Sequence, residues 1–537
     1  MTASWVPQEP RAGTNLKGAA AGGAWTYLLD RMEARRVLCV GKPGEATLRT
    51  LKRIASEVDV TDAGTLTRPG PTVGSQPARS YDLVIVPASV PAGRRDAVLA
   101  AAVARLAPAG VVWAEAAGDG KTLSASMACA GLPQRRAYWL TPRAGELRSA
   151  VPPDDDAIRR YFVSRGVTVP SLPRPLAPIE RRWPTAASRR AGVVGSRGPE
   201  SDARAVPAYL RELALGAGID LERHRIGLSA RGRFSSRKVI AYCFAESADQ
   251  PDLVVKMTRD PAFNDRLENE EDLLRHIVAD GLVDPGTVPV ARFAGVHAGL
   301  RVLGLDAIDG MPMTRVADAE TLDRAFLWLT DLGAASARCD REGASALRTA
   351  IAAVADAVLR TYAPEPAVAS ALTQAVSLVS AQADRIPSVL MHGDCAIWNG
   401  MVKADGRVAF LDWEAGARDA PPLWDLFSLA RSHVAARSGV VRAPRSRRPA
   451  ALVTSIASDD QICRAVMRYR HRLAIPIEVV APLAAIGWGF RALREAPRLE
   501  PGRLERGVYI GMLRSALEPR SMDDLQRRLS GQQASAL

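Results

Sequence analysis

The sequence predicts an α/β domain followed by a two-lobed α+β domain. Short apolar runs alternate with helix-like runs near the N-terminus, the pattern restarts after a Pro- and Arg-rich stretch, and the C-terminal part is mainly helical. The 537 residues are enough for about two to four domains. We predict five segments: a flexible N-terminus (1–24), an α/β domain (25–166), a linker (167–203), a small lobe (204–310) and a helical lobe (311–537).

The composition excludes several classes of protein. Apolar residues make up 47% of the chain, which allows buried cores and excludes a wholly disordered protein. The net charge is +13, but the sparse aromatic residues do not alternate with basic ones, so we expect no nucleic-acid partner. Without a Cys-x-x-Cys pair, an apolar signal core or an uninterrupted apolar stretch, we expect free thiols, no membrane span and a cytoplasmic location. The oligomeric state stays open.

The elements of the first domain follow one another in strand–helix order. Strands are predicted over Arg36–Val40, Val58–Val60, Tyr81–Val86 and Gly110–Ala114. Helices are predicted from about Glu45 to Ala55 and over Asp96–Leu106. This alternation implies a parallel sheet.

The same segment resembles a class I S-adenosylmethionine methyltransferase over about residues 30–145. The matching features are VLCVGKPG, YDLVIV and ARLAPAGVVWAE. The resemblance implies a Rossmann-like fold with S-adenosylmethionine as cofactor. However, the loop Gly41-Lys42-Pro43-Gly44 contains a proline where a Gly-rich backbone should approach the ligand. We favour a degenerate, noncatalytic domain, with an active methyltransferase as the alternative.

The second half begins with a small sheet and continues with helices. Strands are predicted over His224–Leu228, Lys238–Phe244, Leu253–Met257, Val290–Val296 and Leu300–Leu305. Helices are predicted over Val206–Leu215 and from about Phe263 to Val278. After Gly310 the pattern is helical, apart from a short apolar hairpin around residues 390–412.

The most informative stretch is 389–426, which contains His392-Gly393-Asp394, Asn399 and Asp412. Apolar runs precede both acids, so we expect them at strand ends, facing a cleft. Phosphoryl transfer needs an acid to accept the proton of the attacking hydroxyl, and an Asn and a second Asp to hold Mg²⁺ on the phosphates. The spacing Asp-x-x-x-x-Asn matches the catalytic loop of protein kinases.

This stretch resembles the aminoglycoside phosphotransferase and choline kinase family over about residues 205–430. The resemblance implies a bilobal, protein-kinase-like α+β fold and an ATP- and Mg²⁺-dependent phosphotransferase. It implies that Asp394 is the catalytic base, that His392 supports the loop through hydrogen bonds, and that Asn399 and Asp412 bind Mg²⁺. Glu414 is a weaker candidate for the metal or substrate site.

The resemblance also implies a set of nucleotide-binding residues. Lys256, at the end of an apolar run, would hold the α- and β-phosphates, paired with Glu270 of the next helix; Glu271 is the alternative partner. The remaining predicted positions are Ser229 and Gly232 in the phosphate-covering loop, Arg231 or Arg233 for added charge, and Asp306 and Ile308 in a hinge whose backbone holds adenine. Asp425 would brace the catalytic loop rather than act in catalysis.

The acceptor is less well defined by the sequence. From Ala415 onward there are 20 Arg and 11 Asp and Glu, a basic balance that disfavours polycationic aminoglycosides. We therefore expect a neutral or anionic hydroxyl compound, such as a sugar or a glycan end. The alternatives are a bifunctional methyltransferase–kinase of polysaccharide biosynthesis, a noncatalytic pseudokinase scaffold and an antibiotic-resistance kinase. The choice between ATP and GTP also stays open.

Overall fold

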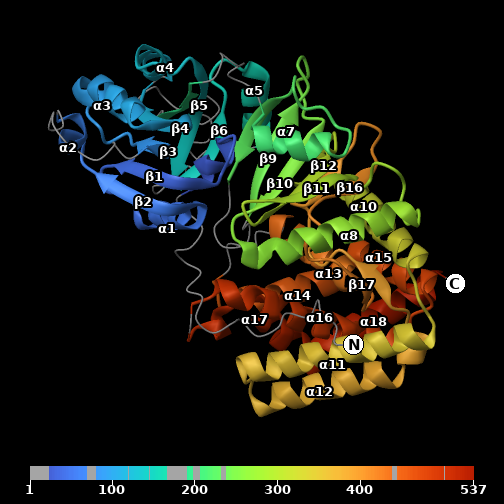
Figure 1. Ribbon diagram of the computed structural model, residues 1–537. Helices are drawn as coiled ribbons and strands as arrows, with labels where there is room; N and C mark the ends of the chain where they lie inside the picture. The colour runs from blue at the N-terminus through green and yellow to red at the C-terminus, as the bar shows by residue number, and fades with distance from the viewer. Residues whose placement is uncertain are drawn as a thin grey trace. The chain divides into compact units, whose positions relative to one another are not determined.

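The computed structural model describes most of the chain as two compact units (Figure 1). The described residues are 23–68, 80–118, 120–143, 146–165, 190–197, 206–230, 238–437, 444–500 and 502–536. The sheet unit comprises those within Asn15–Leu267 and Ala291–Ala307, and the helical unit those within Glu268–Val290 and Ile308–Leu537.

The sheet unit is built on one 12-stranded sheet. The strand order is β11-β12-β10-β9-β8-β6-β5-β7-β4-β3-β1-β2. The strands are β1 (Ala34–Val40), β2 (Ala55–Thr61), β3 (Tyr81–Val86), β4 (Leu106–Ala117), β5 (Gln134–Arg143), β6 (Glu146–Val151), β7 (Arg190–Ser196), β8 (Arg225–Ser229), β9 (Lys238–Phe244), β10 (Leu253–Thr258), β11 (Ala291–His297) and β12 (Leu300–Asp306). Strands β1 to β4 pair in parallel, as predicted, and the other pairs are antiparallel.

Helices cover both faces of the parallel strands (Figure 1). The helices of this unit are η1 (Ala24–Leu28), α1 (Glu45–Ile54), α2 (Ala63–Thr67), α3 (Ala92–Ala104), α4 (Gly120–Cys129), α5 (Asp156–Ser164) and α7 (Ala208–Leu215). Along β1, Leu38 packs with α3 and α4, whereas Cys39 packs with η1 and α1. Successive residues therefore face opposite layers, and both layers are apolar because both faces are covered.

Strand β7 corrects one prediction. It lies inside residues 167–203, which we predicted to be a linker, and it pairs antiparallel with both β4 and β5. Its glycines and flanking arginines are typical of a loop. In the sheet, however, Gly192 and Gly195 leave room for Trp113 and Met127, which would collide with any added Cβ. The glycines therefore serve close packing rather than a turn.

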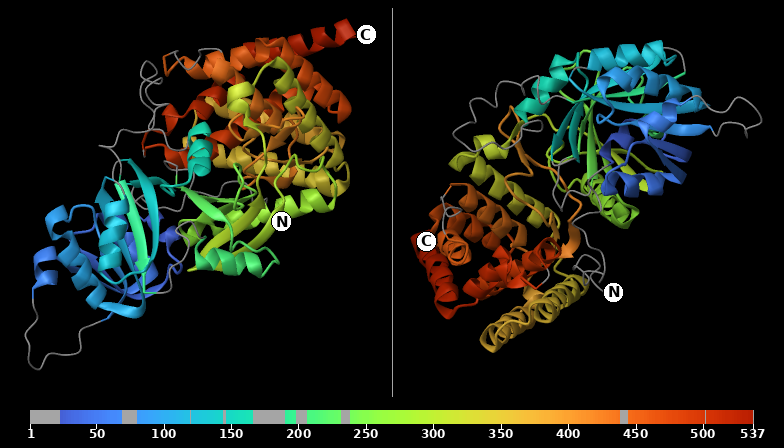
Figure 2. Two further views of the ribbon diagram at one scale, coloured as in Figure 1. Left: turned by 90° about the horizontal axis from the view of Figure 1, so that it is seen from above. Right: turned by 90° about the vertical axis from the view of Figure 1, so that its left-hand side faces the viewer.

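The helical unit contains most of the remaining helices and two small sheets. Its helices are α8 (Asn264–Ala279, from Glu268 onward), α9 (Met313–Val316), α10 (Ala319–Ala335), α11 (Arg341–Tyr362), α12 (Pro366–Ala381), α13 (Trp424–Arg437), α14 (Arg448–Ser458), α15 (Asp460–Arg472), α16 (Val480–Glu495), α17 (Val508–Ala516) and α18 (Pro519–Ala536). Helices α11 and α12 lie side by side (Figure 1), and Figure 2 shows the helical unit from two further directions. One continuous apolar core joins most of these helices.

The two small sheets carry the loops with the predicted catalytic residues. Their strands are β13 (Met311–Pro312), β14 (Val389–Met391), β15 (Gly400–Val402), β16 (Val408–Phe410) and β17 (Ala417–Ala420). They pair in the orders β13-β15-β16 and β14-β17. Among the described residues, none of the helices combines the length and the hydropathy needed to cross a membrane.

Candidate active site

The loop after β14 carries His392, Gly393 and Asp394. Gly393 has a φ of +75°, a left-handed conformation that favours glycine. A Cβ at this position would also collide with the carbonyl oxygen of Ala415. Both observations explain why the residue between the histidine and the acid has no side chain.

His392 joins this loop to the segment that leads to Asp412. Its side chain is fully buried. Its Nδ1 accepts a hydrogen bond from the amide of Asp394 at 3.2 Å, and its Nε2 lies 2.9 Å from the carbonyl oxygen of Leu411. Because Nδ1 accepts, Nε2 carries the proton and donates it to that carbonyl. The contacts of His392 are therefore those of a residue that holds two segments together.

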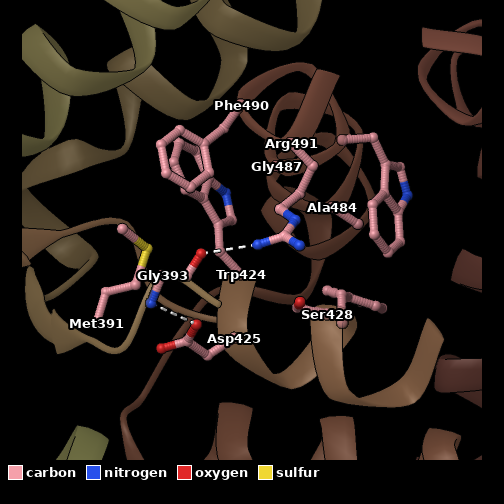
Figure 3. A pocket seen from close by; sticks show the side chains of 11 residues that line it. Met391, Gly393, Trp424, Asp425, Ser428, Ala484, Gly487, Phe490 and Arg491 are labelled. Carbon is pink, nitrogen blue, oxygen red and sulfur yellow. Dashed lines mark hydrogen bonds between the residues drawn. The ribbon is translucent and has the colours of Figure 1, made fainter. Parts of the chain in front are cut away.

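Asp425, in the first turn of α13, holds the same loop from below (Figure 3). Its two carboxylate oxygens accept hydrogen bonds from the amides of His392, at 2.5 Å, and Gly393, at 3.0 Å. Burial raises the pKa of Asp425, although these hydrogen bonds and the charge of Arg491 act in the opposite direction. Asp425 therefore braces the loop by accepting hydrogen bonds from two of its backbone amides.

The Asp394 carboxylate is held from two sides. The side-chain nitrogen of Asn399 donates to the backbone oxygen of Asp394 at 2.9 Å and lies 3.3 Å from its Oδ2. From the other side, Nη2 of Arg491 lies 2.7 Å from Oδ1. Burial alone would raise the pKa of Asp394, but the charges of Arg491 and Arg494 outweigh it and hold the pKa below its usual value. Asp394 is therefore a carboxylate at neutral pH.

Asn399 and Asp412 are brought together by the β15–β16 hairpin. Asn399 directly precedes β15, and Asp412 lies two residues beyond the end of β16. The amide of Leu411 donates to the backbone oxygen of Asn399 at 2.9 Å. Asp412 has a φ of +73°, which is uncommon for a residue with a side chain. The buried Glu270 accepts the amide of Trp413 at 3.1 Å, so the backbone is fixed just beyond Asp412.

Asn399 and Asp412 fit a magnesium ion that binds together with a nucleotide. Mg²⁺ in such sites takes one or two side-chain oxygens from the protein and its other ligands from phosphates and water. Asn399 uses its amide nitrogen on Asp394, which leaves its carbonyl oxygen as the atom to face a cation. Among the described residues, no group of three His, Cys, Asp or Glu side chains is arranged to hold a metal ion.

The structure places the predicted phosphate-binding residues in both units. Ser229 ends β8 and is buried, and Lys256 lies in β10 with 6% of its surface exposed. Glu270 belongs to the helical unit, so its pairing with Lys256 stays a prediction. Gly232 lies outside the described residues, as do Arg231 and Arg233.

The predicted hinge residues are also divided between the units. Asp306 ends β12, where Arg292 binds both oxygens of its carboxylate at 2.5 and 2.7 Å. Ile308 is half-buried and is the first residue of its segment in the helical unit. Their contact with adenine stays a prediction.

Two residues at this site were not expected from the sequence. Arg491 in α16 donates to the carbonyl oxygen of Gly393 at 2.8 Å, in addition to its ion pair with Asp394 (Figure 3). Tyr509 in α17 lies beneath it, with the guanidinium carbon 5.2 Å from the ring centre. Both residues follow the recognisable motifs by about a hundred residues, and only their position in a basic, mainly helical segment could have suggested them.

The C-terminal region matches the phosphotransferase enzyme family. The family profile covers residues 241–456, and a kinase-like fold for this region agrees with that match. Among curated proteins, no sequence matches the chain.

Solved structures give distant similarities. Aminoglycoside phosphotransferase APH(3'')-Id from Streptomyces rimosus, solved with ADP and streptomycin, is 16% identical, with 48% of this chain and 90% of that chain covered and a TM-score of 0.33. Choline kinase LicA from Streptococcus pneumoniae is 14% identical, with coverages of 56% and 92% and a TM-score of 0.35. The bifunctional kinase-methyltransferase WbdD is 11% identical, with coverages of 83% and 84% and a TM-score of 0.26.

The phosphotransferase family match contains only part of the site. It includes His392, Asp394 and Asp412, but it ends before Arg491 and Tyr509. The match therefore covers the loops that carry the acids, whereas two residues that contact the acid loop lie beyond it.

The sheet unit contains a separate cavity of about 190 Å³ next to the ends of β1, β3 and β4. Lys42, Pro43, Glu115 and Arg190 are among its lining residues, and Arg190 lies 3.9 Å from Glu115. These residues do not fit S-adenosylmethionine well. Its sulfonium is a cation, whereas the cavity presents two cations and one acid, and Pro43 removes a backbone donor from the loop.

Proposed function

We propose that the chain transfers the γ-phosphoryl group of Mg·ATP to a hydroxyl of a small molecule, sugar or glycan. The supporting observation is the grouping of Asp394, Asn399 and Asp412 in two hydrogen-bonded loops. These are the groups that phosphoryl transfer needs: one acid for the proton, and oxygen donors for a metal ion on the phosphates. The family match to residues 241–456 supports the same class of reaction.

In this reaction Asp394 accepts the proton of the acceptor hydroxyl. The hydroxyl oxygen forms a bond to the γ-phosphorus while the bond from that phosphorus to the bridging oxygen breaks. The products are the phosphorylated acceptor, ADP and one proton. When bound, Mg²⁺ would neutralise charge on the phosphates, with Asn399 and Asp412 as its protein ligands. The low pKa of Asp394 keeps it deprotonated and ready to accept.

The nucleotide-binding roles of Lys256, Glu270, Ser229, Gly232 and the hinge residues are part of the same proposal. So are the division into a Rossmann-like domain (25–166), a small lobe (204–310) and a helical lobe (311–537). A second activity at the sheet-unit cavity is not proposed, because its charges oppose the methyl donor.

The test is turnover of Mg·ATP with a panel of hydroxyl acceptors, in wild type and Asp394→Asn. The variant should fold normally and lose about a hundred- to ten-thousandfold in rate, the usual contribution of a general base. Asp405→Asn is the matched control, because Asp405 lies in the exposed turn between β15 and β16 and contacts Arg407. Turnover that survives Asp394→Asn would refute the assignment of the base.

Binding should be measured separately, because a noncatalytic scaffold predicts a different result. Melting temperatures with Mg·ATP and with Mg·GTP show which nucleotide binds the folded state. If no nucleotide shifts the melting temperature and no acceptor is phosphorylated, the scaffold interpretation replaces the enzyme.

A further inference from the structure

Two guanidinium groups lie on one aromatic ring beside the predicted base. The guanidinium carbons of Arg431, in α13, and Arg491, in α16, lie 4.9 and 5.2 Å from the centre of the Tyr509 ring. Contacts of this kind between a cation and an aromatic ring are attractive. Arg491 in turn reaches Asp394 at 2.7 Å. The cluster formed by Arg431, Arg491 and Tyr509 therefore adjoins the catalytic loop.

In the described part of the chain, one carboxylate forms an ion pair with the cluster, while Asp425 and Glu495 lie nearby and bind backbone amides. Among the described residues, the one ion pair of Arg491 is with Asp394, and Arg431 forms none. The other hydrogen bonds of Arg491 go to neutral oxygens: the Gly393 carbonyl at 2.8 Å and the Tyr509 hydroxyl at 3.3 Å. In both arginines Nε is buried and lacks a hydrogen-bond partner among the described residues.

Burial ties Arg491 closely to its partners. Its side chain is only 11% exposed, and its ion pair with Asp394 and hydrogen bonds to Gly393 and Tyr509 are what a buried cation needs. Arg494, one turn along α16, adds a third positive charge that also acts on Asp394. A polycationic acceptor would be repelled from this place, whereas an acceptor with an anionic group would complete the charge balance.

We propose that Arg491 and Arg431 bind a carboxylate or phosphate group of the acceptor, so that the enzyme phosphorylates anionic hydroxyl compounds. This inference rests on the proposed function and names its substrate class. Guanidinium groups suit the task because they bind carboxylate and phosphate oxygens through two parallel hydrogen bonds. Tyr509 keeps both groups in place.

The same contact places the anion near the base. Arg491 lies 2.7 Å from Asp394, so an anion held by this guanidinium brings the neighbouring hydroxyl of the acceptor towards Asp394.

The anion should approach from the open side of Asp394. The pocket in Figure 3, between α13, α16 and the catalytic loop, has a volume of about 10 Å³, enough for about one water molecule. It cannot hold a carboxylate or a phosphate group. The side chain of Asp394 is 32% exposed and Arg431 is half-buried, so both are partly open to solvent.

The experiment compares matched acceptors that differ only in charge. One series is glucose, glucuronate and glucose 6-phosphate, and the other is glycerol, glycerate and glycerol 3-phosphate. For each compound, kcat and KM are measured with Mg·ATP, and binding is measured by calorimetry with Mg·ADP present. The carboxylate and phosphate members distinguish the two kinds of anion.

The variants separate charge recognition from folding. Arg491→Gln and Arg431→Gln should each reduce kcat/KM for the anionic member about ten- to a hundredfold more than for the neutral member, the effect of losing a charge-assisted hydrogen bond. Arg491→Lys should restore part of the preference. Arg498→Gln, an exposed arginine in η8 (Ala496–Arg498), is the control and should leave the preference unchanged.

Each outcome decides the proposal. A preference for anionic members that disappears in Arg491→Gln supports it. Equal turnover of neutral and anionic members, unchanged in Arg491→Gln, overturns it and leaves the proposed function standing. The proposal is also overturned if the wild type binds Mg·ATP but binds none of the anionic members. Failure to bind or turn over Mg·ATP at all is a failure of the proposed function itself, and the inference falls with it.

Discussion

The helical-unit loops that carry the proposed catalytic residues and the cavity of the sheet unit both gather charged side chains at strand ends. Only the side chains in the loops are linked to one another by hydrogen bonds and an ion pair of normal length. Asp394 is bound by Asn399 and Arg491, and its loop is held by Asp425. In the cavity, the contact between Arg190 and Glu115 is 3.9 Å long and partly exposed. Buried groups that satisfy one another can tune a pKa and hold a geometry, whereas a loose pair near solvent does little of either.

Asp412→Ala should break the site in these loops most severely. It removes the carboxylate proposed as a metal ligand, so turnover should fall by at least about a hundredfold and Mg·ATP should no longer raise the melting temperature. The measurement is a thermal-shift titration together with initial rates. Asp405→Asn should retain both properties. A normal Mg·ATP shift in Asp412→Ala would show that this carboxylate has no part in nucleotide binding.

Asp425→Ala should mainly affect stability. The change leaves the amides of His392 and Gly393 without acceptors in a buried place, which should cost about 2–5 kcal/mol of unfolding free energy. The check is urea denaturation followed by circular dichroism. Asp419→Ala, which removes a half-exposed partner of Arg338, should cost less than about 1 kcal/mol. Equal losses in the two variants would argue against a bracing role.

The pH dependence of turnover tests the charge on the base. Asp394 acts when deprotonated, and its pKa is lowered by Arg491 and Arg494, so the acid limb of kcat/KM should lie below the usual carboxylate range. In Arg491→Gln one of those charges is gone, and the limb should move to higher pH. Arg498→Gln serves as the control. A limb that stays in place in Arg491→Gln would separate Arg491 from the titration of the base.

The cavity should give the smallest effects. S-adenosylmethionine at millimolar concentration should leave the melting temperature unchanged, because Lys42 and Arg190 oppose its positive charge. Lys42→Ala should leave phosphoryl transfer unchanged as well. A clear stabilisation by S-adenosylmethionine would revive the methyltransferase alternative and remove the contrast between the two regions.

Local patterns in the sequence predicted many elements well. The strand over Tyr81–Val86 is β3, the strand over Lys238–Phe244 is β9, and the helix predicted to begin near Phe263 is α8. Strand β7 was missed because its sequence is rich in glycine and because it is distant in sequence from the strands it pairs with, β4 and β5. These residues form a strand because β4 and β5 provide hydrogen-bonding partners on both sides.

In the candidate site, too, local sequence patterns predicted some residues and missed those that come from distant segments. Spacing alone selected His392, Asp394, Asn399 and Asp412, because they lie within one short hairpin and its flanking loops. Their roles as base and metal ligands stay predictions. Spacing carried no sign of Arg491, which contacts Asp394 across 97 positions of sequence.

The sequence by itself therefore determined the chemistry that the loop can offer, since a turn or a hairpin brings residues together whatever surrounds it. Tertiary structure alone decided which groups hydrogen-bond to that loop and which cations lie next to its carboxylate. Asp425 and Arg491 reach the Asp394 loop from α13 and α16, and Glu270 reaches the segment after Asp412 from α8. Only the packing of distant helices brings these groups to the same place. A contact between distant segments depends on how whole elements pack, which no local spacing records.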